Sequence, residues 1–304
     1  MLIALTVMVA VILDHLLSEP KRFHPLVGFG YLANWLERKV NHEGSGRRLK
    51  GVLALTLLCL PALLVYAIVW FWPESSAALG CLLLYLALGG QSLRRHAVQV
   101  YRALLVGDLK QARMRVGYIV SRETQDMNET QVSQAAVESV LENGCDAIFS
   151  AIFWFVVLGP AGVVLYRISN TLDAMWGYRT PRFEQFGWAA AKLDDLLNWV
   201  PARLTALTYA LMERFTLAIH CWRTQGAVWE SPNAGPVMAA GAGALAVQLG
   251  GAANYHGELK FRPTLGQGNV AQMNDIPRTL NLVLYAQWAW VLVLLVVSGV
   301  LTYV

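Results

Sequence analysis

The sequence predicts an all-α integral membrane protein with about four spanning helices, plus re-entrant and interfacial helices that form a catalytic region on the cytoplasmic side. Two observations support this fold class. Hydrophobic residues make up 56% of the 304 residues and charged residues only 14%, whereas a soluble domain is about 25% charged. Several uncharged runs also approach the roughly 20 residues that a helix needs to cross a bilayer. An ordinary soluble enzyme and a disordered chain are therefore excluded.

Charge and cysteine usage narrow the functional class. The net charge of +4 comes without a dense basic run, so we expect no nucleic-acid partner. The four cysteines lie far apart and form neither a CxxC pair nor a disulfide framework. The lipid bilayer is the expected partner, and the sequence leaves the oligomeric state open, a homo-oligomer included.

Four runs with few or no charges are predicted to span the membrane. They are the N-terminal run from Met1 to Leu13, Gly51–Trp72, Ser75–Leu93 and Thr279–Val304. The N-terminal run is not expected to be a cleavable signal peptide, because no basic residue precedes it and no small-residue cleavage site follows it.

The distribution of Lys and Arg orients these spans. Seven basic residues lie in 19–50, seven in 93–147 and ten in 148–278. With four spans all of them share one face, which the positive-inside rule makes cytoplasmic. The Gly-Pro break then makes 148–167 a re-entrant hairpin, and 204–222 becomes an interfacial amphipathic helix. If 148–166, 204–222 and 231–257 all crossed as well, the basic residues would split sixteen to eight, so four spans are preferred.

This topology divides the chain into three parts. Residues 1–92 hold the N-terminal membrane helices and the basic cytoplasmic loop 19–50. Residues 93–278 form a cytoplasmic or interfacial catalytic region, and 279–304 form the C-terminal transmembrane helix.

An acidic stripe is predicted on a helix that runs from about Thr130 to Asn143 and ends at Gly144. Glu138 and Glu142 lie one turn apart on the same face, and Asp146 continues the line. Unpaired carboxylates at this spacing repel one another. The stripe is either a solvated acidic face or is neutralised, by arginine side chains or by a divalent cation.

A second helical face offers oxygen ligands suited to Mg²⁺. Asp194 or Asp195 shares a face with Asn198, and Mg²⁺ usually binds one or two carboxylates plus substrate phosphates. Pro201-Ala202-Arg203 is expected to end this helix. Arg203 is placed either to bind phosphate or to pair with Asp195.

Three other positions carry weaker signals. Asp173 fits an N-cap or a metal ligand. His24 fits a turn residue held by Pro25 or a group for acid-base work. Asn233 belongs to a turn cluster before a stretch of small residues, in which Gly235, Ala239 and Gly243 favour close helix packing and Gly250-Gly251 is expected to end the helix. The G-x-G-x-x-A pattern in that stretch follows no strand and is not a dinucleotide-binding fingerprint.

Taken in order along the chain, these motifs resemble the CbiB/CobD family of cobalamin biosynthesis, the adenosylcobinamide-phosphate synthases. The matching segments, between residues 14 and about 255, include HPLVG at 24–28, SRET at 121–124, NTLDAM at 170–175, KLDD at 192–195 with Asn198, PAR at 201–203 and SPN at 231–233. The family's first motif usually reads Gly-Asp-Pro where this chain has Ser18-Glu19-Pro20, so the carboxylate is kept on a longer side chain. The membrane protein AmpE is similar in layout but lacks the NTLD and DD-N motifs.

The resemblance implies an ATP-dependent ligase of the bacterial inner membrane, with a corrinoid substrate and its catalytic face in the cytoplasm. Such an enzyme joins adenosylcobyric acid to (R)-1-aminopropan-2-yl phosphate, and an acyl phosphate intermediate is our hypothesis. The expected Mg²⁺–ATP ligands are Asp173, Asp194, Asp195 and Asn198. The expected phosphate-binding and substrate-binding residues are Arg122, Lys192, Arg203, Asn170, His24 and Asn233. The expected bases for the amine are Glu123, Glu138 and Glu142, and Asp173 is also counted as catalytic.

Three other functional classes are weighed against the ligase: a transporter, another membrane transferase and a non-enzymatic sensor. A transporter would use its broken helices to build a midplane site, but the charges lie outside the clear spans and no inverted repeat is visible. Another Mg²⁺-dependent membrane transferase is compatible with the DD-N pattern alone, and only the full ordered set of motifs disfavours it.

Overall fold

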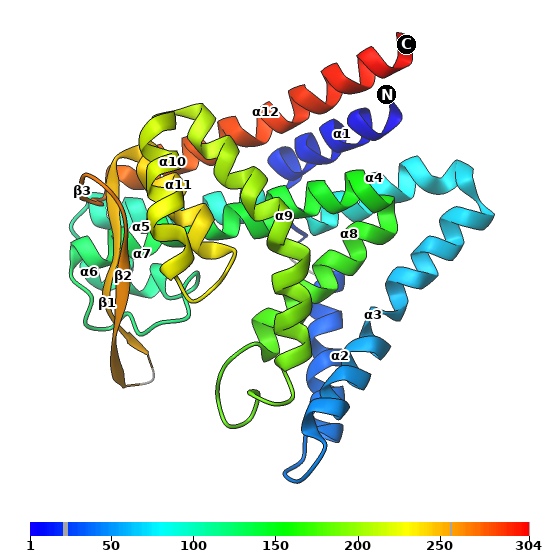
Figure 1. Ribbon diagram of the computed structural model, residues 1–304, viewed down its shortest axis with the longest axis horizontal. Coiled ribbons are helices and arrows are strands. Elements are labelled where there is room, and N and C mark those ends of the chain that lie inside the picture. The colour runs from blue at the N-terminus through cyan, green and yellow to red at the C-terminus, as the bar shows by residue number, and fades with distance from the viewer. Residues whose placement is uncertain (21–23, 256, 304) are drawn as a thin grey trace. The chain divides into compact units, whose positions relative to one another are not determined.

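The computed structural model describes residues 1–20, 24–255 and 257–303, and they are largely helical (Figure 1). The helices are α1 (Leu2–Leu17), α2 (Pro25–Val40), α3 (Arg47–Phe71), α4 (Ser76–Ala87), α5 (Gly90–Leu105), α6 (Leu109–Val116), α7 (Glu129–Gly144), α8 (Ser150–Trp176), α9 (Trp188–Met212), α10 (Phe215–Gln225), α11 (Ala234–Leu245) and α12 (Asp275–Tyr303). A small sheet consists of β1 (Val247–Tyr255), β2 (Glu258–Gly266) and β3 (Asn269–Val270). The all-α membrane class is confirmed, with this sheet as an addition that the sequence analysis missed.

Within the described residues, four helical stretches are long and apolar enough to cross a membrane. They are Arg47–Phe71, Pro73–Leu105, Glu129–Trp176 and Asp275–Thr302. Three of the predicted spans fall almost entirely within these stretches. The N-terminal run differs, because α1 has only 16 residues, or about 24 Å at 1.5 Å per residue, against a hydrocarbon core of about 30 Å.

The segment predicted to be a re-entrant hairpin, 148–167, is part of the helical stretch Glu129–Trp176. A π-helical turn, Cys145–Phe149, joins α7 to α8, so Gly144 does not stop the helix as expected. The predicted break is present inside α8, where Gly159 has φ 64° and ψ −152°. Pro160 follows it and has no N–H for the helical ladder, so the helix kinks here while both arms remain helical.

The described chain separates into two compact units, each built from segments that are distant in sequence. Unit 1 comprises Met1–Gly89, Ser150–Asn198 and Leu295–Val304, and unit 2 comprises Gly90–Phe149 and Trp199–Leu294.

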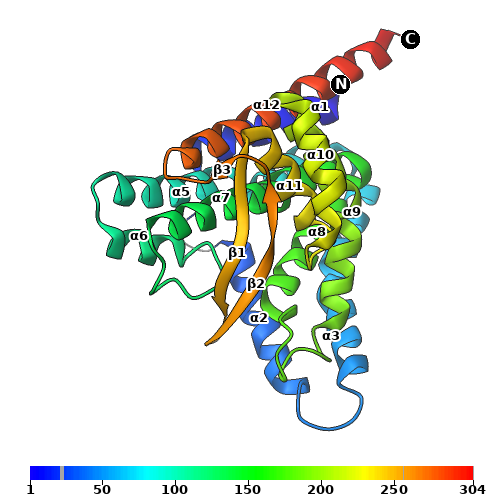
Figure 2. The same ribbon diagram turned by 60° about the vertical axis from the view of Figure 1, so that its left-hand side comes forward.

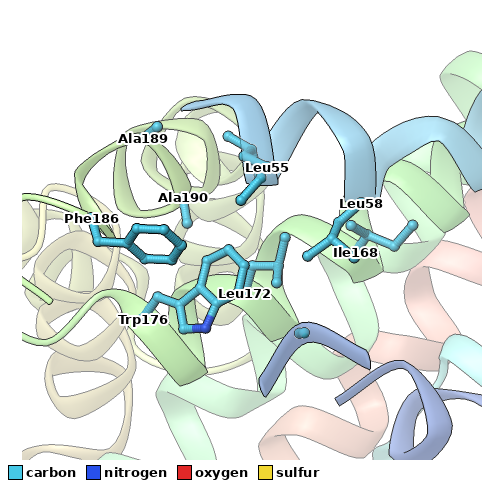
Figure 3. Packing of buried hydrophobic residues seen from close by; sticks show 10 residues of the cluster. Leu55, Leu58, Ile168, Leu172, Trp176, Phe186, Ala189 and Ala190 are labelled. Carbon is cyan, nitrogen blue, oxygen red and sulfur yellow. The ribbon is translucent and has the colours of Figure 1, made fainter. Parts of the chain in front are cut away.

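The core of unit 1 joins helices α2, α3 and α8 to the start of α9. Figure 3 shows Trp176 of α8 facing the ring of Phe186, with their centroids 5.0 Å apart and their planes at 67°. Leu55 of α3 and Leu172 of α8 pack beside them, and all four side chains are at least nine-tenths buried. Such an edge-to-face aromatic pair contributes about 0.5–1.5 kcal/mol beyond its buried area.

Part of the basic loop predicted at 19–50 is the helix α2, which runs beside α3 (Figures 1 and 2). A polar clamp holds the α2–α3 end of the unit to the loop before α9. Glu37 accepts from Nε and Nη2 of Arg182 at 3.0 and 2.6 Å, and Arg47 donates to the carbonyl oxygen of Pro181 at 3.0 Å. Burial by itself would raise the pKa of Glu37, but the hydrogen bonds from Arg182 and Asn41 outweigh it and lower the pKa.

The outer face of α2 is apolar for most of its length. Val27, Tyr31, Leu32 and Trp35 are each about half exposed or more. Between Pro25 and Leu36 the helix carries no charge, and its charged residues gather at its C-terminal end, Glu37 to Lys39. This pattern is typical of a helix whose apolar face meets lipid and whose charged end lies at the interface.

Unit 2 places a long β-hairpin beside α7, α10 and α11, as both ribbon views show (Figures 1 and 2). The three strands have the order β2-β1-β3, with β1 antiparallel to β2 and parallel to β3. The predicted close packing of the small-residue helix is confirmed. A Cβ added at Gly243 would lie 2.8 Å from Cα of Ala218 on α10, and one added at Gly241 would lie 2.5 Å from Leu141 on α7.

Several local expectations are corrected. The interval 204–222 is not one helix, because α9 ends at Met212 and α10 begins at Phe215. Pro201 lies inside α9 and does not end it. Gly250 and Gly251 do not end α11, which stops at Leu245, but form a bulge in β1 with φ values of 90° and 80°. Glycine adopts such angles without the steric cost that other residues pay.

Candidate functional site

The candidate residues fall into two groups, one in each unit. In unit 1 are His24, Asn170, Asp173, Lys192, Asp194, Asp195 and Asn198, and in unit 2 are Arg122, Glu123, Glu138, Glu142, Arg203 and Asn233. Each unit brings some of its candidates into direct contact, and we describe the two groups separately.

The candidate residues of unit 2 centre on Glu138 of α7. A capping box between Asn128 and Gln131 starts this helix and fixes its register. The Glu138 carboxylate is buried and accepts from Nη2 of Arg122 at 2.5 Å, from Nη1 and Nη2 of Arg262 at 2.8 and 3.3 Å, and from the backbone N–H of Gly250 at 2.7 Å. We call Glu138, Arg122, Arg262 and Gly250 the Glu138 cluster.

Arg262 attaches the hairpin to this cluster. Its Nε donates to the carbonyl oxygen of Gly251 and its Nη2 to that of Gly250, both at 3.2 Å. The guanidinium also lies over the ring of Trp229, 5.4 Å from the centroid. The bulge at Gly250 therefore turns both a carbonyl oxygen and an N–H toward the charged side chains.

Glu142 lies one helical turn beyond Glu138 but does not share its hydrogen bonds. It forms no hydrogen bond or ion pair with the residues that the structure describes, although Arg122 and Arg262 act on it electrostatically. The stripe predicted from sequence is thus neutralised by arginine at Glu138, which was one of its two open explanations. Glu142 keeps free acceptor oxygens.

The loop before α7 is bound to the hairpin through Glu123. Its N–H donates to the carbonyl oxygen of Asn254 at 3.0 Å, and its Oε1 accepts from the N–H of Gly257 at 2.7 Å. Between this loop and the hairpin lies an open cleft of about 540 Å³, including space shared with solvent. Its charged lining residues are Arg122, Glu123, Asp126 and Arg262.

The candidate residues of unit 1 centre on Asp194 of α9. Asn198 Nδ2 donates to Oδ2 of Asp194 at 3.0 Å and Asn170 Nδ2 lies 3.4 Å from its Oδ1. Ser150 donates to Oδ1 of Asn198 at 2.6 Å, and Arg167 donates to Oδ1 of Asn170 at 3.2 Å. Burial raises the pKa of Asp194 to about 6, against the lowering effect of the Asn198 and Asn170 hydrogen bonds.

The other acidic candidates of unit 1 lie around this cluster. Asp173 is in the last turn of α8, so it is not an N-cap, and its carboxylate folds over Gly177. A Cβ at Gly177 would lie 2.1 Å from Oδ1 of Asp173, so that position requires glycine. Asp195 pairs with Lys192 at 3.7 Å on the same helix. Among the described residues, no three His, Cys, Asp or Glu side chains gather as a metal site.

His24 and Arg203 occupy ordered positions outside both clusters. His24 caps α2, its Nδ1 accepting from the N–H of Leu26 at 3.2 Å, as expected of a turn histidine. Burial lowers the pKa of His24, with Glu19 acting in the opposite direction. Arg203 donates to Oδ1 of Asn233 at 2.7 Å and to the carbonyl oxygen of Pro232 at 3.0 Å. The predicted turn before α11 is thereby confirmed.

Sequence reasoning missed Arg262, Arg167 and Gly250. Arg167 precedes Asn170 by three residues on one helix, and that i,i+3 spacing was a usable signal. Arg262 is 124 positions from Glu138, and no local pattern predicts their pairing. Gly250 was assigned to a helix end, so its N–H was not considered as a donor.

Comparison with known proteins identifies the family of the chain. The family model described as CobD/Cbib protein matches residues 7–283. A cobalamin biosynthesis protein CobD from Stutzerimonas stutzeri is 57% identical over 97% of this chain and 98% of its own length. The proteins of the same name from Chromobacterium violaceum and Mycobacterium tuberculosis are 52% and 38% identical, covering 94% and 92% of this chain and 94% and 90% of their own lengths. No solved structure matches the chain. On this evidence the chain belongs to the CobD/CbiB family of cobalamin biosynthesis proteins.

Proposed function

We propose that this protein is an ATP-dependent ligase that joins adenosylcobyric acid to (R)-1-aminopropan-2-yl phosphate and yields adenosylcobinamide phosphate. One observation carries the proposal beyond the pathway that the relatives' names give. Asn170 of the NTLD motif meets Asp194 and Asn198 of the DD-N motif in a single polar cluster, although the two motifs are 24 positions apart. The contact between these two motifs supports a buried polar site that would suit charged ligands.

The chemistry needs activation of the carboxylate. Direct attack of an amine on a carboxylate would have to expel an oxide, which is a poor leaving group. In the proposed route, a carboxylate oxygen of the corrin attacks the γ-phosphorus of ATP, which forms an acyl phosphate and releases ADP. The amine then attacks the acyl carbon, phosphate leaves with the C–O bond electrons, and a base removes a proton from nitrogen.

Asp194 suits the Mg²⁺–ATP role that we assign to it with Asp195, Asp173 and Asn198. The carboxylate of Asp194 is buried among neutral amide groups. A cation would compensate its charge, and Mg²⁺ usually completes its coordination with water and substrate phosphates. A lasting cage of three or more acidic ligands is not required for this arrangement.

The remaining candidates are given proposed roles according to their charge and to the contacts that their side chains make. Arg122, Lys192 and Arg203 are proposed phosphate ligands, because arginine and lysine carry the charge that phosphate binding needs. Glu142 and Glu123 are the proposed bases. Glu138 accepts four hydrogen bonds, so we assign it a positioning role. His24, Asn170 and Asn233 are assigned to substrate contact.

The four candidate spans make this a multi-pass membrane protein. We further propose that it lies in the bacterial inner membrane with the ATP site facing the cytoplasm, where ATP is supplied. The amphipathic corrin then stays near the bilayer during the reaction.

The ligase is tested by incubating the protein in detergent with ATP, Mg²⁺, adenosylcobyric acid and aminopropanol phosphate. Mass detection of the amide with matching release of ADP is expected, and corrin-dependent nucleotide use separates a ligase from a transporter. AMP as the nucleotide product would exclude the acyl phosphate route. Asp195→Asn should abolish turnover while membrane insertion is retained, and near wild-type product formation would remove Asp195 from the site.

A matched control uses the exposed ion pair between Lys260 and Glu230. Glu230→Gln changes the same kind of group outside both clusters and should leave turnover unchanged. Loss of activity in both variants would indicate general damage and not a role for Asp195 in the reaction.

A further inference from the structure

The cleft between the 122–127 loop and the β1–β2 hairpin contains an incompletely bonded arginine. The side chain of Arg122 is 6% exposed. An arginine has five N–H donors, and among the described residues those of Arg122 make one hydrogen bond, from Nη2 to Glu138. Because Arg122 lines the open cleft, its remaining donors are available to an acceptor that binds there.

The neighbouring arginine does not share this property. Arg262 uses its donors on Glu138 and on the carbonyl oxygens of Gly250 and Gly251. These bonds hold the hairpin, which forms one wall of the cleft. The Glu138 carboxylate already accepts four hydrogen bonds. An anion entering the cleft would meet Arg122, which has free donors within the described residues, and Arg262, whose donors are already used.

The rim of the cleft carries the opposite charge. Asp126 and Glu123 are exposed lining residues, and Asp126 forms no ion pair within the part of the chain described here. Gln131, Gln134 and Asn254 complete the polar lining, and none of the lining residues is aromatic. The cleft thus offers a cation at its wall, carboxylates at its rim and no aromatic surface for a nucleobase.

We propose that this cleft binds the small zwitterionic substrate, an aminoalkyl phosphate, with its phosphate on Arg122 and its ammonium group at Asp126. This assignment rests on the proposed ligase function and deepens it, because it assigns the amine substrate to residues of unit 2. Glu123, at the same rim, is then the nearest candidate to accept the proton that the amine loses when it attacks.

Binding without ATP tests the assignment independently of turnover. Isothermal titration of the detergent-solubilised protein uses two probes, inorganic phosphate and aminopropanol phosphate. Arg122→Met should weaken both by about 10-fold or more, as expected for the loss of a charge-assisted hydrogen bond, and Arg122→Lys should restore part of the affinity. Asp126→Asn should weaken aminopropanol phosphate and leave inorganic phosphate unchanged or bound more tightly.

Lys260→Gln provides the matched control, since Lys260 lies on the same hairpin but does not line the cleft. Its variant should bind both probes as the wild type does. The assignment is overturned if the wild type binds neither probe, if Arg122→Met binds both normally, or if Asp126→Asn weakens the two probes equally. If Arg122→Met does not fold, the pattern in Asp126→Asn and Arg122→Lys decides.

Kinetics distinguish this assignment from the ligase proposal itself. In the working enzyme, Arg122→Lys should raise KM for aminopropanol phosphate and leave KM for ATP unchanged. An unchanged KM for the amine would refute the cleft assignment while the ligase stands. Phosphate binding at Arg122 without any amide product would support the cleft and refute the ligase.

Discussion

Replacing Glu138 by Gln tests whether one carboxylate holds the hairpin to α7. The substitution keeps the shape of the side chain but removes the negative charge that faces Arg122 and Arg262, whose side chains are 6% and 9% exposed. Breaking a buried ion pair by removing one partner costs about 3–5 kcal/mol, because the remaining charge stays buried without compensation. Here two cations lose their partner, so we expect the upper part of that range.

Thermal unfolding in detergent, followed by circular dichroism, measures the effect. For a chain of this size 1 kcal/mol shifts Tm by roughly 2 °C, so a decrease of about 8–10 °C is expected. Glu230→Gln removes a carboxylate from the exposed pair with Lys260, and such surface pairs contribute at most about 1 kcal/mol. If Glu138→Gln unfolds within 2 °C of Glu230→Gln, roughly the value of one exposed pair, the Glu138 cluster contributes no more than a surface interaction and the reasoning fails.

Unit 1 yields four further predictions. The raised pKa of Asp194, about 6, disfavours its ionised form in the folded state. The unfolding free energy should therefore increase by up to about 3 kcal/mol as pH falls from 7 to 4. Asp194→Asn should remove this dependence, and an unchanged pH profile in that variant would contradict the assignment. Mg²⁺ affinity, measured by titration, should also fall below pH 6, because protonated Asp194 cannot bind the ion. Gly177→Ala would place a Cβ 2.1 Å from Oδ1 of Asp173, so product formation should drop about 10-fold or more, whereas Gly30→Ala, whose nearest neighbour would be 3.8 Å away, should behave as wild type. A nitroxide at Leu32→Cys in proteoliposomes should show high oxygen and low nickel-chelate accessibility, with the reverse at His42→Cys; low access to both reagents at Leu32 would instead indicate a protein contact on the face of α2.

The membrane helices could be predicted because their signal is local. Long uncharged runs such as Gly51–Trp72 are committed to apolar surroundings by their own side chains, whatever they pack against. The acidic helix was also predictable, because Asn128 begins it with a capping box and a 3.6-residue period places Glu138 and Glu142 on one face. The break in α8 was visible in Gly159-Pro160, although not the helical continuation on either side.

The hairpin and its ion pairs required the tertiary structure. The small-residue stretch up to Gly251 reads as one helix, because Ala and Gly carry little pattern to distinguish helix from strand. The chain changes to strand after Ala246, which adopts φ 53°, and β1 is stabilised by pairing with β2 and β3. Strand pairing of this kind depends on context more than on residue preference.

The sequence by itself determined the membrane class, the family and the residue types available for chemistry. Only the tertiary structure decided which charges meet, since Glu138 finds Arg262 124 positions away, and Asp194 finds Asn170 across two helices. The reason is physical: hydropathy and helical periodicity act over a few residues, whereas a buried charge is compensated by whatever partner the folded chain brings within about 3 Å of it.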